Sequence, residues 1–195
     1  GITGGGIPIA AGIALSIKLR KTKQIAVAFF GDGATNQGTF HETLNMASVW
    51  GLPVLFVCEN NLYGMSTHIK QTTNIDHLVK RADAYNIKNF IVDGMDVMDI
   101  CKKSDEAITY VRDNQKPLFI EAKTYRHCGH SKSDPKAYRT KEEEKYWLGK
   151  DCIEAIKKQL LSDGFDVEEL NGINNEVEQE IETALKASEK SEETP

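Results

Sequence analysis

Two short apolar runs, each ending in a polar turn, most constrain what this chain can fold into. The first occupies residues 25–30 and the second residues 53–60. Their lengths and composition predict two buried parallel strands. Between them Phe40, Leu44 and Ala47 recur at helical spacing, which indicates a crossover helix. This stretch therefore predicts a strand, helix, strand unit.

The polar residues that end the two runs are the candidate functional residues. Asp32 follows the first run within a Gly-Asp-Gly turn, and Asn61 follows the second run. A right-handed strand, helix, strand unit brings the carboxyl ends of both strands to one edge of the sheet, where ligands bind. We therefore expect Asp32 and Asn61 to lie close together, and we expect Thr35 or Asn36 to cap the helix.

The donor atoms expected at this edge indicate a magnesium diphosphate. Asp32 supplies a carboxylate, Asn61 supplies an amide oxygen, and a loop carbonyl near Tyr63 can add a third oxygen. Hard oxygen donors of low total charge suit Mg²⁺ that is shared with the phosphates of a ligand. Gly31 and Gly33 let backbone N–H groups approach an anion, and the following helix points its positive end at the same place.

Longer motifs carry a family resemblance. The strings GDGATNQGTFHE and ENNLYGMS, with TYRHCGHSKSDPKAYRTKEEE further on, resemble the alpha subunit of the thiamine-diphosphate-dependent first component of 2-oxo acid and acetoin dehydrogenase complexes. The similarity runs from Gly1 to about Glu144. It implies the thiamine-diphosphate-binding fold, an α/β domain with a parallel sheet flanked by helices. The fold would be N-terminally incomplete here, because further residues precede this point in that family.

The resemblance also implies a set of cofactor-binding residues. They lie in four segments: Gly1, Thr3, Gly31, Asp32, Gly33, Ala34, Asn61, Tyr63 and His130. Asp32, Asn61 and the carbonyl of Tyr63 would hold Mg²⁺. Thr3 stands where the family usually has a larger apolar group that supports the bent cofactor. His130 is the implied catalytic residue, and a near-neutral imidazole suits proton transfer.

The resemblance further implies partners and a reaction. In the family, thiamine diphosphate attacks the carbonyl of acetoin or a 2-oxo acid, and the acyl group passes to lipoyl groups on an acyltransferase core. The acid that activates the aminopyrimidine ring lies on a beta subunit, so we expect an α₂β₂ heterotetramer and an inactive isolated chain. Glu42, Glu59 and Glu121 are the candidate acids within this chain, and the last two are poorly placed.

The substrate is the least determined part of this interpretation. Cys128 stands where many pyruvate-type relatives have a histidine, and GHSKSD is closer to acetoin-type subunits. We therefore expect acetoin first, pyruvate second and a branched 2-oxo acid third. A truncated non-catalytic homologue and a different thiamine enzyme stay open as alternatives.

Three other patterns are weaker site candidates. The glycines of residues 4–8 follow no strand, so a nicotinamide site is not expected. Asp93 and Gly94 repeat the acid-glycine pair at a strand end but lack a partner amide, which favours an ordinary turn. Neighbouring side chains within residues 127–130 cannot converge on zinc. In the same loop, we expect Arg126 and Arg139 to hold the chain in place rather than act on substrate.

Strands and helices alternate along the remaining sequence up to residue 125, which favours a parallel sheet. Before the first strand we expect a helix with Ile9, Ile13 and Ile17 on one face. After the second strand we expect a helix of about three turns over residues 75–85, a strand over 89–94, a helix capped by Asp96 and a strand over 118–125. The inward-facing residues of the helix capped by Asp96 would be Val97, Ile100, Cys101, Ile108 and Val111. We divide the chain into a cofactor-binding α/β domain, residues 1–140, and a helical extension, residues 141–195. The extension would contain two amphipathic helices separated by a turn around Gly164 and Asn171-Gly172, and a frayed tail at 187–195.

Composition excludes some classes of protein. The 195 residues carry 24 basic and 29 acidic side chains, spread along the chain, which disfavours nucleic-acid binding. No apolar run reaches the length of about 18 residues that a membrane helix needs. The four cysteines lack zinc or disulfide-scaffold spacing, which indicates a reduced, cytoplasmic protein.

Overall fold

A computed structural model describes residues 2–192. The chain divides into two compact units, and the first unit ends at Asp151. The first unit is built on a parallel sheet of four strands in the order β1-β2-β6-β5. The strands are β1 (Ala26–Gly31), β2 (Val54–Asn60), β5 (Lys88–Asp93) and β6 (Leu118–Lys123). The α/β class and the parallel sheet predicted from the sequence are confirmed.

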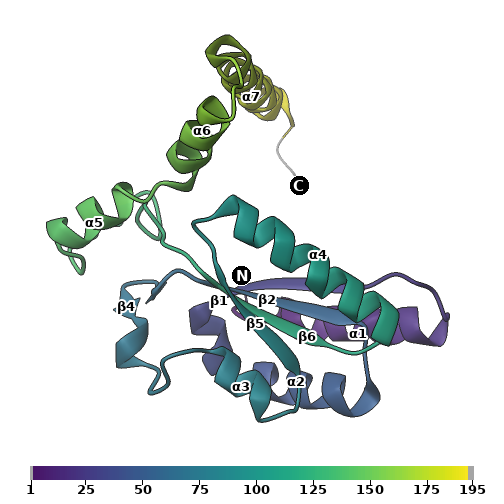
Figure 1. Cartoon of the computed structure of the whole chain (residues 1–195). Coiled ribbons are helices and arrows are strands. Elements are labelled where there is room, and N and C mark those ends of the chain that lie inside the picture. Colours follow the sequence, from purple (N-terminus) through teal and green to yellow (C-terminus); the bar gives the residue numbers. More distant parts are fainter. Residues whose placement is uncertain (1, 193–195) are drawn as a thin grey trace. The chain divides into compact units, whose positions relative to one another are not determined.

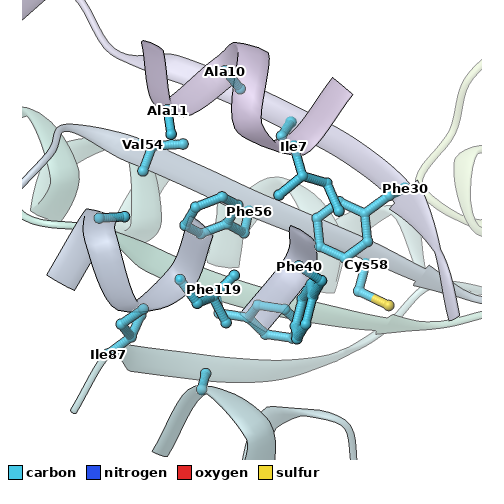
Figure 2. Close-up of a cluster of buried hydrophobic side chains, with 14 of the residues drawn as sticks. Ile7, Ala10, Ala11, Phe30, Phe40, Val54, Phe56, Cys58, Ile87 and Phe119 are labelled. Atoms are coloured by element: carbon cyan, nitrogen blue, oxygen red, sulfur yellow. The ribbon is translucent and has the colours of Figure 1, made fainter. Parts of the chain in front are cut away.

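Helices cover both faces of this sheet (Figure 1). One face packs against α1 (Gly6–Leu19), α2 (Gly38–Trp50) and the short α3 (Val79–Asp83), and the other packs against α4 (Val97–Asn114). Figure 2 shows the first of these cores, in which Phe40 packs against both Phe30 and Phe119, with ring centroids 5.8 and 6.1 Å away. Edge-to-face aromatic packing of this kind stabilises a core beyond simple burial.

Strand β1 is half-buried rather than fully buried as predicted. Ala26, Ala28 and Phe30 face the α1 and α2 core, whereas Val27 is 42% exposed and Phe29 is 68% exposed on the opposite face. This difference arises because β1 is an edge strand and α4 covers the other strands. An unbroken apolar run cannot tell a central strand from an edge strand.

The predicted buried face of α1 is also wrong. Ile9 is 65% exposed and Ile13 is 52% exposed, and only Ile17 of the expected three is buried. The face that packs on the sheet consists of Ile7, Ala10, Ala11, Ala14 and Ile17. This helix is apolar on nearly every side, so periodicity does not select the inner face. Packing selected it, because alanines allow a helix to approach the sheet closely.

The segment between β2 and β5 is less helical than predicted. The expected three-turn helix shortens to α3, which keeps Leu78, Val79 and Ala82 buried. Before it come a small hairpin, β3 (Tyr63–Gly64) with β4 (Thr67–His68), and a 3₁₀ turn, η2 (Ile69–Gln71). Most of this segment therefore remains a loop at the carboxyl edge of β2.

Helix α4 begins as predicted. The Asp96 carboxylate accepts hydrogen bonds from the backbone N–H of Met98 at 2.9 Å and of Asp99 at 3.2 Å. Val97 and Cys101, however, point outward, although the sequence placed them on the inner face. Cap geometry is a local property and is readable from the sequence, whereas the buried stripe depends on the sheet beneath the helix.

Three helices follow the last strand. Helix α5 (Lys141–Leu148) belongs to the first unit, and α6 (Cys152–Ser162) and α7 (Val167–Lys190) form the second. The turn at Gly164 was predicted and has φ +92°. The turn at Gly172 and fraying from residue 187 were wrong, because α7 continues through both positions. One glycine costs about 1 kcal/mol in a helix, which good helix formers on either side outweigh. The last three residues lie outside the described part of the chain.

No helix within residues 2–192 is long and apolar enough to cross a membrane.

Candidate functional site

Two loops meet at the carboxyl edge of β1 and β2. Asp32 opens a 3₁₀ turn, η1 (Asp32–Asn36), directly after β1, and Asn61 directly follows β2. Gly31 is in register with Glu59 of the neighbouring strand, so both loops leave the sheet at the same level. The loops also touch, because a Cβ added to Gly33 would lie 3.5 Å from the Cα of Gly64. The structure thus brings Asp32 and Asn61 to one place.

Asp32 is a buried acid without a complete set of partners. The residue is 4% exposed, and its Oδ1 atom is buried without a hydrogen-bond partner among the described residues. Burial raises the pKa of this carboxyl, while backbone N–H groups of Asp32 itself and of Asn61 and the charge of Arg126 act in the opposite direction. Unpaired buried carboxylates are costly, and a bound cation is one of the few ways to offset that cost.

The loop after β2 uses its two asparagines differently. The Asn60 side chain turns into the core, where Nδ2 donates to Oε1 of Glu121 at 2.7 Å. The Asn61 side chain stays at the sheet edge, and its Oδ1 accepts the backbone N–H of Tyr63 at 3.1 Å. Leu62, which follows both asparagines, has φ +72°, a left-handed conformation that reverses the chain. The loop that carries Asn61 and the Tyr63 carbonyl lies against the turn that carries Asp32, because Gly64 and Gly33 approach each other.

The η1 turn is held by groups that the sequence analysis did not identify. Thr35 Oγ1 donates to the carbonyl of Asp32 at 2.7 Å. Arg81, from α3, donates to the carbonyl and hydroxyl of Thr35 and to Oδ1 of Asn36. The predicted helix cap by Thr35 or Asn36 is wrong, because Gln37 is the N-cap residue of α2 and its side chain makes no capping hydrogen bond. Nothing local in the sequence indicates that Arg81 is a neighbour.

Residues 126–139 form a loop held by two arginines, as predicted, and we call it the His loop. Arg126 donates to the carbonyl of Met65 at 2.7 Å, to that of Tyr63 at 3.4 Å and to Nδ1 of His130 at 3.4 Å. Arg139, 8% exposed, donates to the carbonyl of Arg126 at 2.6 Å and also to that of Cys128. These bonds attach the His loop to the loop after β2.

An aspartate organises the tip of the His loop. Asp134 accepts the backbone N–H of His130 at 2.8 Å, that of Lys136 at 2.9 Å and the hydroxyl of Tyr138 at 2.6 Å. The tyrosine hydrogen bond and these backbone bonds lower the pKa of Asp134 to about 2. His130 itself is exposed, so its ring is available to a ligand at the sheet edge.

The amino-terminal loop contributes less to the described site. Gly1 lies outside the described residues. Thr3 is exposed in the turn that precedes α1. A Cβ added to Gly4, which has φ +78°, would lie 3.5 Å from Cγ of Gln37, so this turn packs against the start of α2. Gly31 and Ala34 belong to the β1 and η1 segments already placed at the edge.

The three candidate acids within the chain differ in their surroundings. Glu42 and Glu59 are exposed, and Glu121 is fully buried. Besides Asn60, the Glu121 carboxylate accepts the backbone N–H of Val79 at 3.2 Å and pairs with Nζ of Lys123 at 2.6 Å. Glu121 therefore holds β6 to its neighbours.

The rival motifs are structural. Gly94 donates its N–H to the carbonyl of Lys123 at 2.8 Å, and a Cβ at Gly94 would lie 2.8 Å from that oxygen, so close packing requires this glycine. Asp93 accepts the N–H of Met95 in the same turn. Across residues 2–192, no group of three or more His, Cys, Asp or Glu side chains could hold a metal ion. The magnesium hypothesis drawn from the sequence uses a different donor set, with one carboxylate, one amide and one backbone carbonyl.

The sequence matches a known protein family over its whole length. The family described as "Dehydrogenase E1 component" matches residues 1–195. The chain belongs to the dehydrogenase E1 component family. The alpha subunit of acetoin:2,6-dichlorophenolindophenol oxidoreductase of Bacillus subtilis is 45% identical over 192 residues, which is 98% of this chain and 57% of the relative. The resemblance drawn from the motifs is confirmed.

Other relatives are named for pyruvate rather than acetoin. The pyruvate dehydrogenase E1 component subunit alpha of Rickettsia felis is 41% identical over 98% of this chain and 59% of its own length. The mitochondrial pyruvate dehydrogenase E1 component subunit alpha of Sminthopsis macroura is 41% identical over 94% of this chain and 51% of its own length. The chain therefore spans little more than half of the curated relatives that it matches.

Proposed function

We propose that this chain binds thiamine diphosphate through Mg²⁺ as part of the alpha subunit of an acetoin or 2-oxo acid dehydrogenase. The observation that carries the proposal is the buried, unpartnered Oδ1 atom of Asp32 at the edge where β1 and β2 end. A magnesium ion there would satisfy the carboxylate, and its remaining coordination positions would suit diphosphate oxygens. The residues present fit the cofactor that the family implies.

Each residue at this edge has a role in the proposal. Asp32, Asn61 and the carbonyl of Tyr63 hold Mg²⁺, and the backbone of Gly31, Gly33 and Ala34 faces the diphosphate. When bound, thiamine diphosphate supplies the carbon nucleophile that attacks the substrate carbonyl and the electron sink that allows bond cleavage.

His130 and the amino-terminal turn would serve the two ends of the cofactor. His130 is exposed and accepts a hydrogen bond from Arg126, so it can exchange a proton near the reacting centre. Gly1 and Thr3 would face the aminopyrimidine ring. Residues 1–140 would form the cofactor-binding domain, and residues 141–195 would form its helical extension.

A second subunit supplies what this chain lacks in the proposal. Glu121 is fully engaged in the core, and Glu42 and Glu59 are exposed. We therefore propose that a beta subunit contributes the activating acid, in an α₂β₂ heterotetramer that transfers the acyl group to a lipoyl-bearing acyltransferase. No nucleic acid or membrane partner is proposed, and the assembly would be cytoplasmic.

Acetoin is the proposed substrate, with pyruvate as the second candidate and a branched 2-oxo acid as the third. The acetoin-named relative is 45% identical and the two pyruvate-named relatives are 41% identical. Cys128, the departure from many pyruvate-type sequences, is exposed in the His loop. Turnover of acetoin, pyruvate and branched 2-oxo acids by the complex reconstituted with a beta subunit would rank the three.

Calorimetry tests the binding step directly. Titration of the chain, assembled with its beta subunit, with thiamine diphosphate should release heat that depends on Mg²⁺. Asp32→Asn should weaken this binding at least about tenfold, because the only charged protein ligand is lost. Asp93→Asn is the matched control, since it removes an acid before glycine at another strand end. Absence of magnesium-dependent heat in the wild type would favour a non-catalytic homologue.

A further inference from the structure

The side chain of Tyr63 is anchored outside its own loop. Its phenol oxygen donates to the Glu143 carboxylate and lies 2.9 Å from both oxygens. Glu143 lies in the first turn of α5, where Thr140 Oγ1 caps the helix by accepting the Glu143 N–H at 3.1 Å. This contact joins residues 80 positions apart and links the loop after β2 to the helix that follows the His loop.

The Tyr63 ring is enclosed on several sides. The residue is 4% exposed, and the Arg139 guanidinium carbon lies 4.8 Å from the ring centroid. The rings of His68 and Tyr138 lie 5.0 and 5.3 Å away. Burial, together with the Glu143 hydrogen bond, raises the pKa of Tyr63 to about 12, so the phenol remains a donor at neutral pH. The ring can therefore hold the position of its own backbone.

The backbone of the same residue belongs to the loop that carries the proposed magnesium ligands. The Tyr63 N–H donates to Oδ1 of Asn61, and the Tyr63 carbonyl accepts from Arg126. Leu62 and Met65, on either side of the short strand β3, have φ of +72° and +55°. Both values lie in the left-handed region of backbone conformation, which non-glycine residues rarely adopt. Two such residues indicate a backbone that the surrounding contacts hold in place. A shift of the Tyr63 ring would move the oxygens at positions 61 and 63 together.

We propose that Glu143 is a positioning residue that, through the Tyr63 hydroxyl, fixes the loop after β2 and couples its order to that of the His loop. The identity of the ligand rests on the proposed function, whereas the coupling of the two segments rests on the contacts alone. Glu143 acts through another residue and contacts no reacting atom. Ordering of one segment should therefore stabilise the other.

A double-mutant cycle tests the coupling through metal affinity. The variants are Tyr63→Phe, Glu143→Gln and the double variant, each assembled with the beta subunit and titrated with Mg²⁺ at saturating thiamine diphosphate. Each single change should weaken Mg²⁺ binding about tenfold, because a hydrogen bond to a charged group is lost or weakened. The double variant should be no weaker than the worse single variant. Glu142→Gln removes the same charge from the same exposed helix turn and should bind within about twofold of the wild type.

Hydrogen exchange without any cofactor gives the independent readout. In the chain alone, Tyr63→Phe should accelerate exchange of the amides of His130, Lys136 and residue 63, all of which donate to side chains in the two segments, and Glu142→Gln should not. Faster exchange in the β2 and β6 amides as well would show general destabilisation and overturn the inference. Wild-type magnesium affinity in both single variants, or additive losses in the double variant, would also overturn it. A wild-type chain without magnesium-dependent heat would refute the proposed function instead, and exchange alone would then decide the coupling.

Discussion

Glu121 offers the sharpest test of how the sheet supports the candidate site. Its side chain is fully buried in β6 and accepts three donors: Asn60 Nδ2 at 2.7 Å, the Val79 N–H at 3.2 Å and Lys123 Nζ at 2.6 Å. Glu121→Gln keeps the volume but replaces one acceptor oxygen with a donor NH₂ group. Because all three neighbours are donors, at least one N–H of the new amide faces a donor group and makes no hydrogen bond with it.

The size of this effect follows from the bonds lost. Hydrogen bonds to charged groups contribute about 1.5–3 kcal/mol each. The Lys123 side chain is 30% exposed and can turn to solvent, so its pairing should count for little. The loss therefore centres on the bonds from Asn60 and Val79, and we expect the free energy of unfolding to fall by about 2–4 kcal/mol.

Urea unfolding followed by tryptophan fluorescence measures this loss. Both tryptophans, Trp50 and Trp147, belong to the first unit, so the signal reports the unit that contains Glu121. The midpoint should fall while the slope stays constant. Glu59→Gln, an exposed glutamate on the adjacent strand, is the control and should change stability by less than about 0.5 kcal/mol. Equal, small effects of the two substitutions would refute the assignment of Glu121 as a buried acceptor.

Three further predictions concern the acid, the core and a tight turn. Burial raises the pKa of Asp32 in the folded state, so the contribution of this carboxyl to stability is largest below its unfolded pKa and is lost as pH rises. Asp32→Asn should therefore stabilise the metal-free chain more at pH 7 than at pH 4. Equal changes in melting temperature at the two pH values would contradict this. Phe40→Ala should lower the free energy of unfolding, measured by chemical denaturation, by about 3–5 kcal/mol. Phe29→Ala, at a residue that is 68% exposed, should lower it by less than about 1 kcal/mol. Similar losses for the two variants would contradict the burial of Phe40 and the exposure of Phe29. Gly94→Ala should lower the free energy of unfolding by about 1–3 kcal/mol because the new Cβ meets a backbone oxygen. Gly172→Ala, in an open helical position, should instead stabilise its helix by about 1 kcal/mol. Circular dichroism on heating would detect both changes, and an unchanged stability of Gly94→Ala would contradict the close contact.

The strand, helix, strand unit and its polar ends could be predicted because their signals are local. Residues 25–30 and 53–60 are apolar runs bounded by turn residues, and the handedness of the connection places Asp32 and Asn61 at one edge. The Asp96 cap was predictable for the same reason, since a cap involves only the next three residues. The family was also readable, because its motifs are contiguous strings.

Sequence alone thus determined the type of sheet, the position of the acid and amide along it, and the family, all of which depend on residues near one another in the chain. Only the tertiary structure decided that the Asn60 side chain turns into the core, which side of α1 is buried and which distant side chains hold the loops. Arg81 reaches Thr35 across 46 residues, and Glu143 reaches Tyr63 across 80. Such contacts have no periodicity or spacing to reveal them, because they form only once the strands have set the distance between the loops.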